Sequence, residues 1–270
     1  MTATTASRTT ATRFHSRLSG ILAAAAVLFV CVPLPSRSAP VLIDSLGLAA
    51  CTATALALRL PPAIRTLLYI DAVYALSLAG GRLGWGTPAT TTAVVVVPVL
   101  ALKLADRAPS LRPTLPWLTR GRPTRGDLAL MLAVVALSVL ALTLWAALAK
   151  PKAPAYLENL HHGSKIVLVL GVLGFALVNP LWEEAFFRGV VLTELAQLWC
   201  APSALGFQAV TFGLAHLNGF PSGAVGACLA GFWGLALGVI RLRTRGLLWP
   251  YIAHVCADTA IAVIAIAMLH

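Results

Sequence analysis

Long apolar runs separated by short polar segments dominate this sequence. A run of roughly 18 apolar residues is long enough for a helix to cross the hydrocarbon core of a bilayer. The pattern therefore predicts an all-α fold, a polytopic transmembrane helical bundle of eight or nine spans. The count is open because Asp44, Asp71 and Pro98 interrupt three of the runs. The candidate spans are 18–34, 41–58, 67–81, 88–105, 128–149, 166–199, 203–217, 223–240 and 247–268.

Two of these runs need a separate interpretation. The run at 166–199 is longer than one span requires, and Pro180 removes a helix hydrogen bond, so we expect a bend near Pro180 or an extension beyond the bilayer. The run at 18–34 follows three arginines and resembles a secretory signal peptide. The "SRSAP" that follows it is a poor cleavage site, so we expect a retained span and keep a cleaved signal as the alternative.

Composition supports the membrane interpretation. Hydrophobic residues make up 59% of the 270 residues and charged residues only 11%, too few for the surface of a soluble domain of this length. The net charge of +11 lies in short loops between apolar runs, so we attribute it to membrane orientation and expect no nucleic acid partner. The five cysteines show no spacing typical of a zinc site or a redox pair, and we expect no disulfide framework.

The distribution of basic residues predicts the orientation. Cytoplasmic loops of membrane proteins are enriched in Arg and Lys. With a cytoplasmic N-terminus, nine alternating spans leave five basic residues outside and thirteen inside. The inside set is Arg8, Arg13, Arg17, Arg59, Arg65, Arg107, Arg112, Arg120, Arg122, Arg125, Arg241, Arg243 and Arg245. We interpret the "RLRTR" run at 241–245 as a topogenic charge cluster and the segment 107–126 as a cytoplasmic linker.

The predicted organisation has four parts. Residues 1–17 form a cytoplasmic tail, 18–149 an N-terminal transmembrane region, 150–165 a loop and 166–270 a C-terminal helical core. The core holds most of the polar residues that interrupt apolar runs. Charged side chains within a membrane are costly and usually face the interior of the bundle.

The stretch "NPLWEEAFFRG" places two glutamates and an arginine in an apolar run. Glu184 and Arg188 are four residues apart, so they share a helix face and can form an ion pair. Glu183 is rotated by about 100° from Glu184 and shares its face with Phe187, so it has no local partner. We therefore expect Glu184 to be held by Arg188 and Glu183 to project into a cavity, where a carboxylate suits general acid or base catalysis.

Two further pairs repeat this spacing. Phe212 precedes His216 by four residues, which lets the phenyl ring pack beneath the imidazole. His254 precedes Asp258 by four residues, and a carboxylate one turn away can fix the tautomer and orientation of a histidine.

Each feature also has a structural interpretation. An intramembrane Glu–Arg pair is often structural, and a lone histidine in an apolar helix is more often a hydrogen-bonded core residue than a catalyst. The pair of His254 and Asp258 also fits a helix-packing contact. Three such features on three separate helices favour a common site.

The three motifs in this order resemble those of the CPBP family (Abi, CAAX protease and bacteriocin-processing), which comprises intramembrane glutamic proteases similar to the type II CAAX prenyl endopeptidase. EExxxR is present as Glu183, Glu184 and Arg188, FxxxH as Phe212 and His216, and HxxxN/D as His254 and Asp258. The resemblance covers roughly residues 170–270. It implies a helical bundle around a water-filled cavity, in which a glutamate-activated water attacks a peptide carbonyl.

The resemblance also implies roles for these residues. Glu183 is the general base, and His216 holds or polarises the water. His254 and Asp258 stabilise the oxyanion. Glu184 and Arg188 orient Glu183. Asparagine is typical of the CAAX endopeptidases at position 258, and the wider family also admits aspartate. An aspartate donates a hydrogen bond only when protonated, so an orienting role for Asp258 toward His254 stays open.

The family resemblance leaves a metal site to consider. Glu, His and Asp are all plausible zinc ligands. The glutamate-activated water is nevertheless the mechanism that related structures favour, so we expect no cofactor and no metal. The "ENLHH" stretch at 158–162 lacks the histidine spacing of the zinc-protease helix.

We therefore predict an endopeptidase of the bacterial plasma membrane, acting on a membrane-associated or lipidated protein or peptide. Two alternatives belong to other classes. One is a non-catalytic family member, such as a bacteriocin-immunity or scaffold protein. The other is a transporter, but the sequence lacks the paired repeats expected of one.

Overall fold

A computed structural model describes residues 3–31, 41–149, 165–219 and 222–267. These residues form helices joined by short loops, with no strand among them, so the predicted all-α fold is confirmed. The predicted loop at 150–165 lies outside the described residues except for Lys165, and so does the "ENLHH" stretch. Most of the predicted tail at 1–17 is helical, because α1 (Ala3–Cys31) begins at Ala3.

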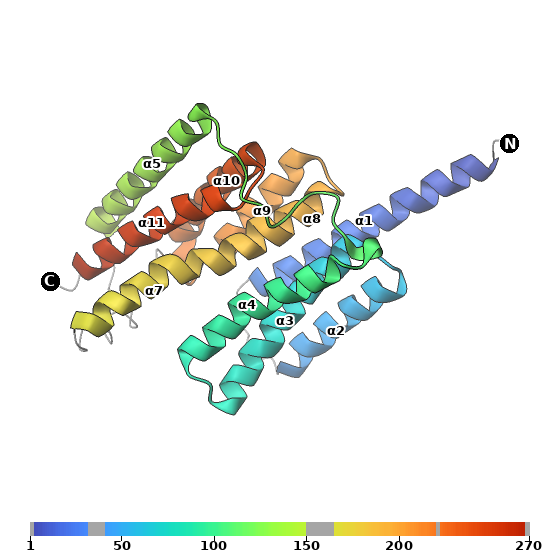
Figure 1. Ribbon diagram of the computed structural model, residues 1–270, viewed down its shortest axis with the longest axis horizontal. Helices are drawn as coiled ribbons and strands as arrows, with labels where there is room; N and C mark the ends of the chain where they lie inside the picture. The colour runs from blue at the N-terminus through green and yellow to red at the C-terminus, as the bar shows by residue number, and fades with distance from the viewer. Residues whose placement is uncertain (1–2, 32–40, 150–164, 220–221, 268–270) are drawn as a thin grey trace.

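The N-terminal helices pack around α3. They are α1, α2 (Val41–Ala57), α3 (Pro61–Leu83) and α4 (Thr87–Ala105), and Figure 1 shows them together in one half of the molecule. Two prolines begin α3. Proline is tolerated there because the first N–H groups of a helix have no intrahelical acceptor. Gly84 ends α3 in the left-handed conformation, with a φ of 66°.

A linker then crosses the bundle to α5 (Arg125–Ala149), passing through the short helix η1 (Pro109–Leu111). Thr124 and Asp127 form a reciprocal cap at the start of α5, in which each backbone N–H donates to the other side chain. The predicted N-terminal region at 18–149 includes α5, yet α5 packs against α10 and α11 of the other half.

The C-terminal helices form the second half of the bundle (Figure 1). Helix α9 packs on α10, and α11 packs on α7 and α5. Small residues let α9 and α10 approach closely, since a Cβ on Gly213 would lie 2.6 Å from the carbonyl oxygen of Ala227. The elements are α7 (Lys165–Glu183), the π-helix η2 (Glu184–Val191), α8 (Leu192–Ala196), α9 (Ala201–Ala215), α10 (Gly223–Thr244) and α11 (Leu248–Ala267).

Among the described residues, six helical segments are long and apolar enough to cross a membrane. They are Phe14–Cys31, Pro61–Leu83, Arg125–Ala149, Ile166–Ala196, Gly223–Thr244 and Leu248–Ala267. Large apolar side chains project from them, with Leu132 on α5 66% exposed. The protein is therefore an integral membrane protein.

The predicted count of eight or nine spans is not matched by these six. The runs at 41–58, 88–105 and 203–217 form shorter apolar helices. Helix α9, for example, has 15 residues. At 1.5 Å per residue it is roughly 22 Å long, less than the roughly 30 Å of the hydrocarbon core. Apolar composition alone does not separate such a buried short helix from a full span.

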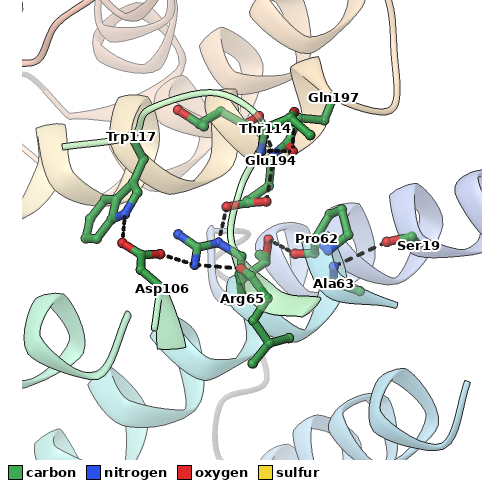
Figure 2. A network of polar contacts seen from close by, with 12 residues as sticks. Ser19, Pro62, Ala63, Arg65, Asp106, Thr114, Trp117, Glu194 and Gln197 are labelled. Atoms are coloured by element: carbon green, nitrogen blue, oxygen red, sulfur yellow. Dashed lines mark hydrogen bonds and ion pairs between the residues drawn. The ribbon is translucent and has the colours of Figure 1, made fainter. Parts of the chain in front are cut away.

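A buried ion-pair network joins the two halves (Figure 2). The Arg65 side chain, 1% exposed, donates from Nε to Glu194 Oε1 at 2.6 Å and from Nη1 to Asp106 Oδ1 at 2.6 Å. Trp117 of the linker donates to the other oxygen of Asp106 at 2.9 Å. Helix α3, the end of α4, the linker and α8 thus meet at one guanidinium group.

This arrangement corrects two assignments made from the charge pattern. Arg65 and Arg241 were predicted to lie in cytoplasmic loops, but both are buried within helices. Arg241 donates from Nη2 to the carbonyl oxygen of Pro116 at 2.8 Å. Arg65 binds α8 through Glu194, and Arg241 binds the linker through Pro116. Because both are buried in such contacts, they are weak indicators of which loops face the cytoplasm.

Candidate active site

The long helix changes its winding where the glutamates lie. Helix α7 continues through Pro180 to Glu183, and the π-helix η2 follows from Glu184 to Val191. The wider turn is visible at its end, where the N–H of Leu192 donates to the carbonyl oxygen of Phe187, five residues back. The bend near Pro180 or extension beyond the bilayer stays a prediction, and the π-helix was not predicted. Such an element is frequent at functional sites.

Glu184 forms the predicted pair with Arg188. Arg188 Nη1 donates to Glu184 Oε1 at 2.8 Å, and the two side chains are 0% and 2% exposed. Arg188 also donates to the carbonyl oxygen of Gly234 at 3.2 Å, and its guanidinium lies 4.4 Å from the centre of the Phe212 ring. The pair therefore fixes η2 against α9 and α10.

His254 is held by the same carboxylate. Its Nδ1 lies 2.8 Å from Glu184 Oε1, the oxygen that Arg188 binds. Because a carboxylate accepts, Nδ1 carries the hydrogen, and Nε2 is left to face the opposite direction. Glu184 thus orients a histidine 70 residues away in the sequence, a contact that its spacing to Arg188 gave no indication of.

Glu183 faces both histidines. Its Oε2 lies 3.5 Å from His254 Nε2, and its Oε1 lies 3.8 Å from His216 Nε2. Both distances exceed an ordinary hydrogen bond, and the buried Oε2 has no hydrogen-bond partner among the described residues. The carboxylate that was expected to lack a local partner therefore projects between two imidazoles.

His216 lies at the end of α9 with its tautomer fixed. Its Nδ1 lies 2.8 Å from the carbonyl oxygen of Phe212, which can only accept, so Nδ1 carries the hydrogen and Nε2 is free to accept. The Phe212 and His216 rings are 4.4 Å apart at their centres, the packing expected from their spacing. Phe212 itself packs edge-on against Phe187 at 4.9 Å, which ties α9 to η2.

Asp258 has a partner that the sequence analysis missed. Its Oδ1 lies 3.6 Å from His254 Nε2, and its Oδ2 accepts from Asn179 Nδ2 at 3.0 Å. Trp182 Nε1 donates to Asn179 Oδ1 at 3.2 Å, which fixes the amide so that its NH₂ points at Asp258. One signal was available, because Asn179 lies four residues before Glu183 in an apolar helix.

These side chains line one cavity of about 640 Å³. Glu183, His216, His254, Asp258 and Asn179 reach it, whereas Glu184 and Arg188 do not line it and support it from behind. Residues of α5, α10 and the α9–α10 loop complete its wall. Every predicted site residue is thus brought to one place, divided into a cavity-facing set and a buried supporting pair.

The residues facing the cavity do not form a recognisable metal site. In the part of the chain that the structure describes, no three His, Cys, Asp or Glu side chains are arranged as ligands of a metal ion. A metal-free site stays a prediction.

Part of the chain matches a known protein family. Residues 165–260 match the family described as Rce1-like, the type II CAAX prenyl endopeptidases. The matched segment contains all seven predicted site residues: Glu183, Glu184, Arg188, Phe212, His216, His254 and Asp258. The resemblance seen in the three motifs is therefore confirmed over this segment. Searches of curated proteins and of solved structures found no match.

Proposed function

Starting from this match to a protease family, we propose that the protein is an intramembrane endopeptidase in which Glu183 activates a water molecule. The single observation that carries the proposal is the position of the Glu183 carboxylate, at 3.5 Å from His254 and 3.8 Å from His216 in a cavity. Glu184 is unsuited to the role because Arg188 and His254 already occupy one of its oxygens and it does not line the cavity.

The attacking water sits between Glu183 and His216. Both Glu183 Oε1 and His216 Nε2 accept hydrogen bonds, so a water that donates one hydrogen to each satisfies both groups. Its lone pair is then directed away from both acceptors and toward the cavity. In the reaction the water oxygen bonds to the peptide carbonyl carbon while its proton passes to Glu183.

His254 stabilises the charge that develops on the carbonyl oxygen. In the proposal its Nε2, which faces the Glu183 and Asp258 carboxylates, bears a hydrogen and donates a hydrogen bond to the oxyanion, and His254 keeps that proton throughout. The tetrahedral intermediate collapses when the C–N bond breaks and the proton held by Glu183 moves to the leaving nitrogen. Every proton taken from water is thereby returned to a product.

Asp258 then has an orienting role. Because Asn179 donates to Oδ2, Asp258 is bound as an acceptor, with Oδ1 directed at His254. This supports the second of the two roles considered for Asp258, in which it positions the imidazole. The CAAX endopeptidases typically have an amide side chain at position 258. In this protein the amide next to Asp258 is that of Asn179.

The substrate is proposed to be a peptide attached to a lipid or to an apolar membrane segment. An aromatic cavity of about 260 Å³ adjoins the catalytic cavity and shares Trp182, Phe187 and Ala215 with it. Residues of α1 and α3, including Tyr69 and Tyr74, form its other walls. An apolar group held there brings a neighbouring peptide bond to the carboxylate.

The proposal is tested with the purified full-length protein and an internally quenched peptide ending in a farnesylated CAAX sequence. We expect cleavage by the wild type and a loss of at least about 100-fold for Glu183→Gln, which keeps the volume but removes the base. Asp71→Asn is the matched control, because Asp71 lies in another helix and bonds Thr52 at 2.7 Å. Cleavage by Glu183→Gln at the wild-type rate would refute the mechanism.

A second arm addresses substrates other than prenylated peptides. The Glu183→Gln variant is used to capture bound proteins from membranes, and each captured protein is then exposed to the wild type. Proteins retained by the variant and cut by the wild type would support an endopeptidase. Full biological activity of a Glu183→Ala/His216→Ala variant would instead favour a non-catalytic role.

A further inference from the structure

A second polar cavity lies away from the catalytic site, where the linker meets the turn between α10 and α11. Three hydrogen bonds join these segments: Arg122 N to Thr244 O at 2.9 Å, Leu247 N to Thr119 O at 2.8 Å, and Thr119 Oγ1 to the Arg245 carbonyl at 2.7 Å. Two segments more than 120 residues apart in the sequence are therefore joined directly through their backbones.

Glycines make this contact possible. Gly121 has a φ of 76°, and a Cβ there would lie 2.5 Å from the carbonyl oxygen of Thr244. A Cβ on Gly246 would collide with the backbone of Arg120 and Gly121. The two backbones thus approach more closely than any residue with a Cβ would allow.

Those side chains are arginines. Arg120, Arg122, Arg243 and Arg245, together with Trp249, line a pocket of about 960 Å³, which we call the arginine pocket. The four arginines are exposed, and Trp249 is half-buried. Arg243 donates to Asp127 at 2.6 Å, and no described carboxylate pairs with the other three.

The chain has few carboxylates left to neutralise them. Seven of its nine acidic residues have described side chains. Six of these lie away from the pocket, and the seventh, Asp127, pairs with Arg243. The six are Asp71 with Thr52, Asp106 and Glu194 with Arg65, Glu183 and Asp258 at the catalytic cavity, and Glu184 with Arg188 and His254. Among the described side chains, the pocket therefore has three arginines in excess of its carboxylates.

The arginine pocket lies at one end of three membrane-length helices, the position at which a spanning helix meets the interface with the lipid headgroups. It is formed where α10 ends at Thr244, α11 begins at Leu248 and α5 begins at Arg125, and all three helices are long enough to span a bilayer. Helix α10 has 22 residues, so the pocket is roughly 30 Å from Ser222, which lines the catalytic cavity at the other end of α10. Tryptophan and arginine are enriched at this interface.

We propose that the arginine pocket binds the phosphate groups of an anionic phospholipid headgroup. The planar guanidinium groups match phosphate oxygens with paired donors. Three uncompensated charges suit a headgroup with two phosphates, such as that of cardiolipin. Trp249 also lines the pocket, and tryptophan is a side chain suited to the region where headgroups meet acyl chains.

A topogenic role alone does not account for the geometry. Orientation of a membrane protein depends on how many basic residues a loop carries, and it does not require them to converge on one concavity. Arg245 also adopts a φ of 55°, a left-handed conformation at the end of α10 that glycine adopts at lower cost. The chain keeps an arginine side chain at this strained position, and that side chain lines the pocket.

The test measures the thermal unfolding midpoint of the full-length, delipidated protein in neutral detergent. Cardiolipin, phosphatidylcholine and inorganic phosphate are titrated separately, and a ligand that binds the folded state raises the midpoint in a saturable way. We expect cardiolipin alone to do so. In the Arg120→Gln/Arg122→Gln/Arg245→Gln variant, the apparent Kd should weaken by at least about tenfold.

The matched control removes the same charge elsewhere. Arg59→Gln/Arg82→Gln/Arg107→Gln changes three other exposed arginines that have no carboxylate partner among the described side chains, and it should retain the wild-type response. Equal weakening in both variants, or an equal response to phosphatidylcholine, overturns the proposal. A response to inorganic phosphate that matches cardiolipin overturns the assignment to a lipid. No peptidase activity is measured, so the result is independent of the proposed function.

Discussion

The same substitution at the two adjacent glutamates should change stability by very different amounts, since only Glu184 is bound to buried partners. Glu184 Oε1 accepts from Arg188 and from His254, each at 2.8 Å, and all three side chains are at least 96% buried. Glu184→Gln leaves the Arg188 guanidinium buried without its counter-ion. Breaking a buried pair by neutralising one partner costs about 3–5 kcal/mol.

Glu183 makes no comparable contact. Its buried Oε2 has no hydrogen-bond partner among the described residues, and its nearest imidazole nitrogens are 3.5 and 3.8 Å away. Glu183→Gln removes a buried charge and keeps the shape, so we expect a change below about 1 kcal/mol, in either direction.

The assay is thermal unfolding of the purified protein in detergent. At about 2–4 °C per kcal/mol, Glu184→Gln should lower the midpoint by roughly 10 °C, and Glu183→Gln by less than about 4 °C. A Glu184→Gln/Arg188→Met variant should recover part of the loss, because neither charge is then left alone. Equal losses for the two single variants, or a greater loss for Glu183→Gln, would show that the two carboxylates do not have the separate roles assigned here.

Three further outcomes are expected. Asn179→Ala should lower kcat on the farnesylated peptide by about tenfold with little change in KM, since its amide is bound to Asp258 and acts on His254 through that carboxylate; an unchanged kcat would contradict this role. Arg65→Met should lower the unfolding midpoint by an amount equivalent to about 3–5 kcal/mol, and the drop should be smaller when Glu194→Leu is added. Single cysteines at Ser222 and Ser110, in an otherwise cysteine-free chain, should be labelled from opposite faces of sealed vesicles, and labelling from one face would exclude the proposed orientation.

The parts of the site that the sequence predicted are local. The pairing of Glu184 with Arg188 and the packing of Phe212 on His216 follow from side chains four residues apart on one helix, and helix geometry sets that distance wherever the helix lies. The apolar runs likewise predicted the helices, since in a bilayer each backbone polar group must be satisfied within its own helix.

The parts that escaped prediction depend on how helices pack. The bond from His254 to Glu184 joins α11 to the start of η2, and nothing in either segment specifies it. Arg65 was assigned to a loop because a charge at the edge of an apolar run usually marks a span end. Its two carboxylate partners are 41 and 129 residues away, so their contribution to burying it was not apparent from the sequence.

The Arg65 network bears on where the protein can be divided. The family match begins at residue 165, so Glu194 lies within the matched segment, whereas Arg65, Asp106 and Trp117 lie before it. A fragment cut at the family boundary would keep the seven predicted site residues. It would lose the α5 side chains that line the cavity and Arg65, the cation that pairs with Glu194 among the described residues. The front half, though unmatched, therefore supplies both the counter-charge of a carboxylate in the matched segment and part of the wall of the candidate active site.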